Sequence, residues 1–155
     1  MTTPTTATKS PPTRSDFRYF DTIDTRWADN DVYGHVNNVA YYSFFDTVVN
    51  RLLIDNGWLQ LDGSGPIGLV VETRCQYFAS VSYPAVLDIG LTILKLGNSS
   101  VVYQLAVFSE GSEQASAVGQ FVHVYVDRPS HMPTSLPADL RAGLSHYLKD
   151  SEEPE

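Results

Sequence analysis

The longest periodic pattern in the chain lies between residues 38 and 56, where apolar side chains recur at the three- and four-residue spacing of an α-helix. Asn37 or Asn38 is placed to cap the start of this helix, and Asn56-Gly57 supplies a stop signal. The apolar stripe is wide and bulky, so we expect one long, deeply buried helix. Its members include Tyr41, Phe44, Phe45, Val48, Val49, Leu52 and Leu53.

Five further segments have the composition of β-strands: Phe17–Trp27, Ile67–Phe78, Val86–Leu96, Ser100–Ser109 and Ala115–Val126. Short turn sequences such as Gly97-Asn98 separate the later ones, which predicts antiparallel pairing. We expect the last four strands to form a meander, followed by a short helix near residues 138–148. The predicted fold class is α+β: one long central helix wrapped by a curved antiparallel sheet of about five strands.

The two ends of the chain differ from its middle. Residues 1–16 are rich in Thr, Pro and Ser and have no large aliphatic side chain after the initiator, which predicts a disordered leader. Residues 150–155 are mostly acidic and predict a disordered tail. We therefore expect a single domain over residues 17–149.

Composition narrows the class of function. The formal charge of −8 argues against nucleic-acid binding, which needs a basic face. No apolar stretch approaches the roughly 18–20 residues that span a bilayer, and no secretory signal is present, so no membrane partner is expected. The single cysteine, Cys75, is typical of a reducing compartment, and we expect a cytoplasmic enzyme. The histidines lack metal-ligand spacing, and neither a metal nor a cofactor is expected.

The candidate chemistry stands directly before the predicted helix, in the run Arg26-Trp27-Ala28-Asp29-Asn30-Asp31-Val32-Tyr33-Gly34-His35-Val36-Asn37-Asn38. A helix start offers free backbone N–H groups and a partial positive charge. We expect Asp31 to act on a polarised carbonyl as nucleophile or general base, the alternative being a turn-forming aspartate. The N–H groups of Gly34, His35 and Val36 are the candidate oxyanion hole. Asp29, Asn37 and Asn38 are expected to support the loop.

These residues resemble those of the hotdog-fold thioesterases of the 4-hydroxybenzoyl-CoA thioesterase type. The resemblance runs from about Phe17 to Pro137. The motif that carries it is Arg26-Trp27-x-Asp29-x-Asp31-x-x-Gly34-His35-Val36-Asn37-Asn38-x-x-Tyr41, with weaker matches at Tyr77, Tyr83-Pro84, Asp88, Gly97-Asn98-Ser99-Ser100 and Val124-Tyr125-Val126-Asp127-Arg128.

The resemblance implies a helix enclosed by one sheet, a homodimer or homotetramer with sites at a subunit interface, and hydrolysis of an acyl-CoA substrate. By motif alignment the family's catalytic aspartate falls on Asp31. One departure concerns the helix, where related sequences often have a Glu followed three residues later by Arg. This chain has Asp46 and Val49 there, with Arg51 displaced, which leaves the acyl preference open.

Two groups of residues are candidates for substrate binding. Tyr41 and Phe45 on the helix are expected to line the acyl pocket, where bulky aromatics suit a medium acyl or an aryl group. Ser99, Ser100 and Arg128 are expected to bind the CoA moiety, because arginine suits phosphates.

The leading hypothesis is therefore an acyl-CoA thioesterase. A hotdog hydratase or dehydratase is an alternative, in which Asp31 and His35 share one substrate water. A non-catalytic acyl-CoA-binding domain is a second alternative, which the presence of Asp31 disfavours. No G-x-S-x-G elbow and no glycine-rich phosphate loop occur in the sequence.

Overall fold

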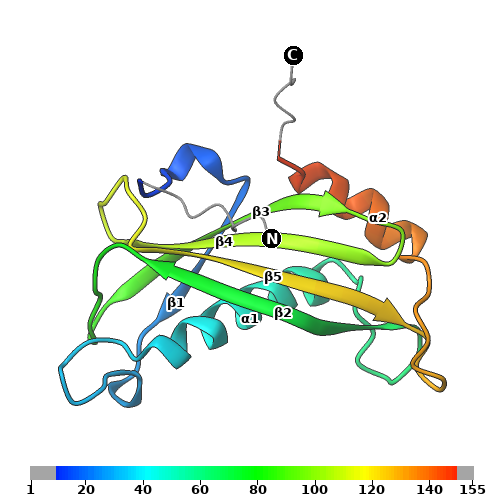
Figure 1. The fold of residues 1–155 in the computed structure, drawn as a ribbon, viewed down its shortest axis with the longest axis horizontal. Helices are drawn as coiled ribbons and strands as arrows, with labels where there is room; N and C mark the ends of the chain where they lie inside the picture. Colours follow the sequence, from blue (N-terminus) through cyan, green and yellow to red (C-terminus); the bar gives the residue numbers. More distant parts are fainter. Residues whose placement is uncertain (1–9, 150–155) are drawn as a thin grey trace, which may run out of the picture.

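The protein is described by a computed structural model that covers residues 10–149. Its strands are β1 (Tyr19–Asp24), β2 (Ile67–Tyr77), β3 (Val86–Leu96), β4 (Ser100–Ser109) and β5 (Ala117–Val126). Its helices are α1 (Asn38–Asp55) and α2 (Ala138–Leu144), with 3-10 turns η1 (Arg14–Asp16), η2 (Trp27–Asp29) and η3 (Ser145–Tyr147). The predicted α+β architecture, with one long helix against an antiparallel sheet, is confirmed (Figure 1).

The strand order in the sheet is β1-β3-β4-β5-β2, and every neighbouring pair is antiparallel. Strands β3, β4 and β5 form a meander as expected. The prediction that β2 is the first strand of this meander, next to β3, was wrong, because β2 pairs with β5 and lies at the edge of the sheet. The chain after β2 runs past the start of α1, where Val36 N donates to Val81 O at 2.8 Å. It therefore returns to the far side of the sheet, where β3 pairs with β1.

The core lies between α1 and the concave face of the sheet. Phe45, Val48 and Val49 of α1 are fully buried against it. Gly119 permits this close packing, because a Cβ at that position would lie 2.4 Å from the Phe45 ring. Burial of each large apolar side chain contributes roughly 1.5–3 kcal/mol, so this face supplies most of the driving force for folding. Leu140 and Leu144 of α2 join the same core.

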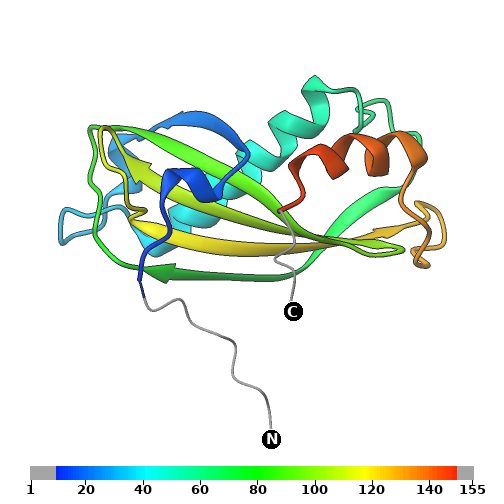
Figure 2. The same ribbon diagram turned by 90° about the horizontal axis from the view of Figure 1, so that it is seen from above.

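Different structural elements lie at the two ends of the molecule. The loop before α1 lies at one end, and α2 lies at the other (Figures 1 and 2). The β3–β4 turn and the segment after β5 are at the α2 end, where Leu136 N donates to Asn98 O at 3.0 Å. Any site at the start of α1 is therefore separated, within one chain, from residues near 98 and 128.

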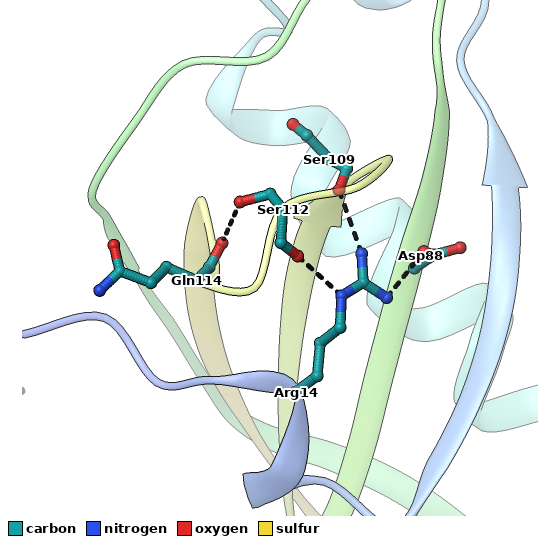
Figure 3. Close-up of polar contacts among 5 residues, drawn as sticks. All are labelled: Arg14, Asp88, Ser109, Ser112 and Gln114. Atoms are coloured by element: carbon teal, nitrogen blue, oxygen red, sulfur yellow. Dashed lines mark hydrogen bonds and ion pairs between the residues drawn. The ribbon is translucent and has the colours of Figure 1, made fainter.

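Residues 13–16, which the sequence analysis assigned to the leader, pack against the sheet. Arg14 donates from Nη1 to Asp88 Oδ2 at 2.9 Å and from Nε to Ser112 O at 2.7 Å (Figure 3). Its guanidinium also lies 4.9 Å from the centroid of the Phe108 ring. The composition of the leader gave no sign of this anchor, which is polar and cation–π in character. Residues 1–9 and the predicted tail, 150–155, lie outside the described residues.

Candidate active site

The loop before α1 is folded back on itself at Gly34. Asp31 N donates to His35 O at 2.8 Å, and Gly34 N donates to Asp31 O at 3.0 Å. Gly34 has a φ of +84°, a left-handed conformation that residues with a Cβ rarely adopt. The turn therefore requires glycine, and it sets the direction in which the side chain of Asp31 projects.

The carboxylate of Asp31 is only partly engaged by the loop. Its Oδ1 accepts hydrogen bonds from Tyr33 N at 2.9 Å and His35 N at 3.3 Å, whereas Oδ2 has no partner among the described residues. The half-buried side chain lines a cavity of about 440 Å³ at the start of α1. The other lining residues are His35, Val36, Asn38, Tyr41, Tyr77, Phe78, Ala79 and Ser80.

The structure changes the expected oxyanion hole. Gly34 N and His35 N are bonded to Asp31, and Val36 N is bonded to Val81 O, so all three predicted donors are already occupied. The glycine turn folds the loop onto itself and occupies the first two donors, whereas the connection between β2 and β3 occupies the third. The first helical residue is different: among the described residues, Asn38 N has no partner, and Asn38 lines the cavity. A free N–H at this position is general for helix starts.

The two support residues of the loop have clear partners. Asp29 is 3% exposed; its Oδ2 accepts from Arg26 N at 2.8 Å, and its Oδ1 accepts from Arg26 Nη2 at 2.9 Å. Asn37 N donates to Asp29 O at 2.7 Å, and Asn37 Oδ1 caps α1 by accepting from Val39 N at 3.0 Å. Asp29 thus holds the turn that leads into the loop, while Asn37 fixes the start of the helix.

Aromatic rings form the wall of the cavity farther along α1. The Tyr41 and Tyr77 ring centroids are 5.0 Å apart in an edge-to-face arrangement. Burial raises the pKa of Tyr41 to about 12 and that of Cys75 to about 11, so both groups are protonated at neutral pH. Phe45, which we expected in the acyl pocket, is fully buried against Gly119 and Phe121 instead. It lies one helical turn beyond Tyr41, over the centre of the sheet.

The expected CoA-binding residues lie at the other end of the sheet from Asp31. Ser100 pairs with Val124, whereas the cavity is next to the Tyr77–Ala117 pair. Arg128 donates from Nε to Gly65 O at 3.1 Å and from Nη2 to Ser64 O at 3.3 Å. Within one chain, Ser99, Ser100 and Arg128 are therefore not brought together with Asp31.

Several residues at the site were missed by the sequence analysis. Phe78, Ala79 and Ser80 line the cavity, but the sequence showed only that they follow a strand. Asn30 Oδ1 accepts from Tyr83 N at 3.0 Å, and Ser82 Oγ donates to Gly34 O at 2.8 Å. These bonds tie the connection between β2 and β3 to the loop, and no local sequence signal reveals a contact between such distant segments.

Residues 10–149 were also searched for membrane-spanning helices and for clusters of metal-binding side chains. No helix in this part of the chain is long and apolar enough to cross a membrane. The same residues contain no cluster of three or more His, Cys, Asp or Glu side chains arranged to hold a metal ion.

Comparison with known proteins defines the family. Residues 25–144 match the model of the thioesterase-like superfamily, and the chain belongs to that superfamily. It is thus a thioester hydrolase. No curated protein sequence matches the chain.

Solved structures support the same assignment of fold. The PA5185 protein from Pseudomonas aeruginosa strain PAO1 is 49% identical, with 92% of this chain and 99% of that chain covered and a TM-score of 0.88. A 1,4-dihydroxy-2-naphthoyl-CoA thioesterase from Synechocystis is 18% identical, with coverages of 82% and 95% and a TM-score of 0.75. DHNA-CoA thioesterase from Staphylococcus aureus is 19% identical, with coverages of 83% and 87% and a TM-score of 0.72. The last two similarities concern the hotdog fold alone.

Proposed function

We propose that the protein hydrolyses acyl-CoA to a free carboxylate and CoA, with the carboxylate of Asp31 as nucleophile or general base. The observation that carries this proposal is the pairing of two groups at one cavity. Asp31 Oδ2 and Asn38 N–H both belong to residues that line it, and neither has a partner among the described residues. One is an electron-pair donor and the other a hydrogen-bond donor, as carbonyl chemistry requires.

In the proposed mechanism, Asn38 N–H donates to the carbonyl oxygen of the thioester. The positive end of the α1 dipole stabilises the negative charge that develops on this oxygen. Asp31 either attacks the carbonyl carbon or removes a proton from the attacking water. In the first case the C–S bond breaks, CoA leaves as the thiolate, and water hydrolyses the resulting anhydride. In the second case the carboxylate and CoA form directly.

We further propose that the protein is a dimer in which β2 pairs with β2 of a second copy. β2 is an edge strand of 11 residues, and an edge strand offers a backbone to which another strand can be added. Leu69, Val70 and Val71 on this strand are 38%, 47% and 59% exposed, an apolar run that pairing would cover. The family resemblance, which implies sites at a subunit interface, supports the same arrangement.

Antiparallel pairing also bears on the CoA-binding residues. It brings the α2 end of one copy beside the Asp31 end of the other, because the two strands run in opposite directions. Ser99, Ser100 and Arg128 of the partner subunit would then lie at the same end of the dimer as Asp31 of the first copy. Their proposed role in CoA binding therefore depends on the dimer.

The test is thiol release from a panel of aryl, short, medium and long acyl-CoAs, with wild type and Asp31→Asn compared. We expect wild type to release CoA and Asp31→Asn to lose at least about 10³-fold in kcat, while its circular dichroism stays unchanged. A wild type that binds acyl-CoA without releasing thiol would show a binding domain. Hydration of a crotonyl thioester without thiol release would favour the hydratase alternative.

A further inference from the structure

Two buried polar side chains in the core have no role in the chemistry described above. His123 of β5 is 4% exposed and Tyr103 of β4 is fully buried, with ring centroids 5.2 Å apart. Both ring nitrogens of His123 and the hydroxyl of Tyr103 lack a hydrogen-bond partner among the described residues. Leaving such groups unpaired is costly to stability, so the polar pair at this place calls for an explanation.

The pair lies on the concave face, with His123 one strand and Tyr103 two strands in from the β2 edge of the sheet. In the register of the sheet, His123 is flanked by Val101 of β4 and Val70 of β2. Gly68 of β2 leaves space for the ring: a Cβ at this position would lie 3.3 Å from His123 Nδ1 and 3.0 Å from the ring of Tyr125. On the side of β2, a residue without a side chain therefore faces Nδ1.

Within its own chain, His123 is far from the cavity. Tyr77 pairs with Ala117, and His123 is six positions farther along β5, a distance of about 20 Å at the rise of a strand. The proposed dimer changes this relation. Full overlap of two antiparallel β2 strands centres the pair on Glu72 and places Tyr77 of one copy opposite Ile67 of the other. Ile67 pairs with Val126, so His123 of the partner subunit then lies two strand spacings across the sheet and three residues along β5 from Tyr77, about 14 Å in all.

We propose that His123, backed by Tyr103, is a specificity-determining residue that forms the polar end of the acyl pocket in the neighbouring subunit and binds a hydroxyl or keto oxygen on the acyl group. This proposal rests on the proposed function and on the β2-paired dimer. The acyl group would extend from the thioester at Asp31, past the rings of Tyr41 and Tyr77, toward the partner's Gly68.

The side chains of His123 and Tyr103 favour a neutral polar substituent on the acyl group of the substrate. A neutral imidazole offers one donor and one acceptor, and a phenol offers both, so either can bind a hydroxyl. Burial lowers the pKa of His123, with the carboxylate of Asp46 acting in the opposite direction, and the ring is neutral at pH 7. A second carboxylate on the acyl group would therefore find no cation here and is expected to be disfavoured.

The experiment compares pairs of acyl-CoAs that differ only in one distal hydroxyl group, for wild type, His123→Phe and Gly68→Ala. We expect wild type to favour the hydroxylated member in kcat/KM by about tenfold, the scale of one hydrogen bond. His123→Phe removes the polar group and Gly68→Ala fills its approach, so both should abolish the preference. The matched control is Gln120→Leu on the same strand, three positions from His123 and therefore on the opposite face of the sheet. This variant should keep the preference.

Mixed dimers test whether the residue acts across the interface. In a dimer of one Asp31→Asn chain and one His123→Phe chain, the intact Asp31 belongs to the chain with Phe at position 123. Its neighbour supplies the intact His123, so the preference for the hydroxylated substrate should return. If His123 acted within its own chain, the mixed dimer would show no preference.

A readout without turnover separates this inference from the proposed function. The ¹⁵N resonances of the His123 ring should shift when the hydroxylated free acid binds, and shift less with the unsubstituted acid. An absence of thiol release would overturn the proposed function, and the resonances would still report on His123. Equal kcat/KM for both substrates in wild type and in His123→Phe, or bound acid without a shift, would overturn the inference.

Discussion

The loop before α1 contains two carboxylates with opposite surroundings. Asp29, in its first half, is buried and has both oxygens bonded to Arg26. Asp31, in its second half, faces the cavity, and its Oδ2 has no partner within the part of the chain that the structure describes. The difference shows that two carboxylates in one short segment can have different roles. The carboxylate with both oxygens hydrogen-bonded holds the backbone, and the one with an oxygen left unbonded is the candidate for contact with a substrate.

The same division holds for the backbone N–H groups. The donors of Gly34 and His35 are bonded to Asp31 within the loop and that of Val36 is bonded to Val81, whereas that of Asn38 has no partner among residues 10–149. A candidate catalytic group is thus recognised by an unused bonding capacity at a cavity rather than by its residue type. The following predictions test this rule, beginning with the largest effect.

Replacing Asn38 by proline removes its backbone N–H and should show the contribution of this donor to catalysis apart from that of the loop. Proline is well tolerated at the first helical position, and the extended backbone of Asn37 (φ −65°, ψ 142°) suits a residue before proline. We expect Asn38→Pro to lower kcat for thiol release by about 10²-fold, the usual effect of removing one oxyanion donor. Asn38→Ala keeps the N–H, so the difference between the two variants measures the donor alone. Equal kcat values for these variants would contradict the assignment.

Replacing Asp29 should mainly affect stability. Asp29→Ala leaves Arg26 N and the turn η2 without their acceptor, and we expect a loss of about 2 kcal/mol in the free energy of unfolding. Urea denaturation measures this loss. Asp31→Asn is the matched variant, because the amide oxygen can still accept from Tyr33 N. It should change stability by less than about 0.5 kcal/mol. The comparison fails if Asp31→Asn is the more destabilised of the two.

His123 is a third case: it is buried like Asp29, but its ring nitrogens have no hydrogen-bond partner among the described residues. Burial lowers its pKa below the ordinary value of 6.5, so the unfolded chain takes up a proton that the folded chain does not. The free energy of unfolding is not reduced by this group above about pH 6.5. Below that pH it decreases by at most about 1.4 kcal/mol per pH unit on account of His123. Unfolding of wild type and His123→Phe between pH 7.5 and 5 measures this slope, which should be shallower in the variant. Identical slopes would show that another group governs the pH dependence.

The smallest effect is expected at the helix cap. Asn37→Ala removes the oxygen that accepts from Val39 N and should cost about 1 kcal/mol of stability. The cap also holds the start of α1 in place, so a modest decrease in kcat is expected as well. Asn37→Asp retains the acceptor and should restore the melting temperature. A melting temperature in Asn37→Ala equal to that of wild type would show that the cap does not bear on stability.

Much of this molecule follows from local sequence. The helical period from residue 38 to 56 predicted α1 to within one residue, because burial of one face leaves the pattern in the sequence. The strand segments, the glycine turn at Gly34 and the cap at Asn37 are equally local. The family motif identified Asp31, and the structure places that residue at a cavity.

Only the tertiary structure decided which groups are available for chemistry. Pairing of β2 with β5, the position of Phe45 in the core and the separation of Arg128 from Asp31 depend on contacts between distant segments. The choice of Asn38 over the three earlier N–H groups also needed the folded loop, since a donor is free only when every nearby acceptor has another partner. Sequence determines the periodicity of elements and the chemistry on offer, whereas the packing of elements determines which of those groups remain unpaired.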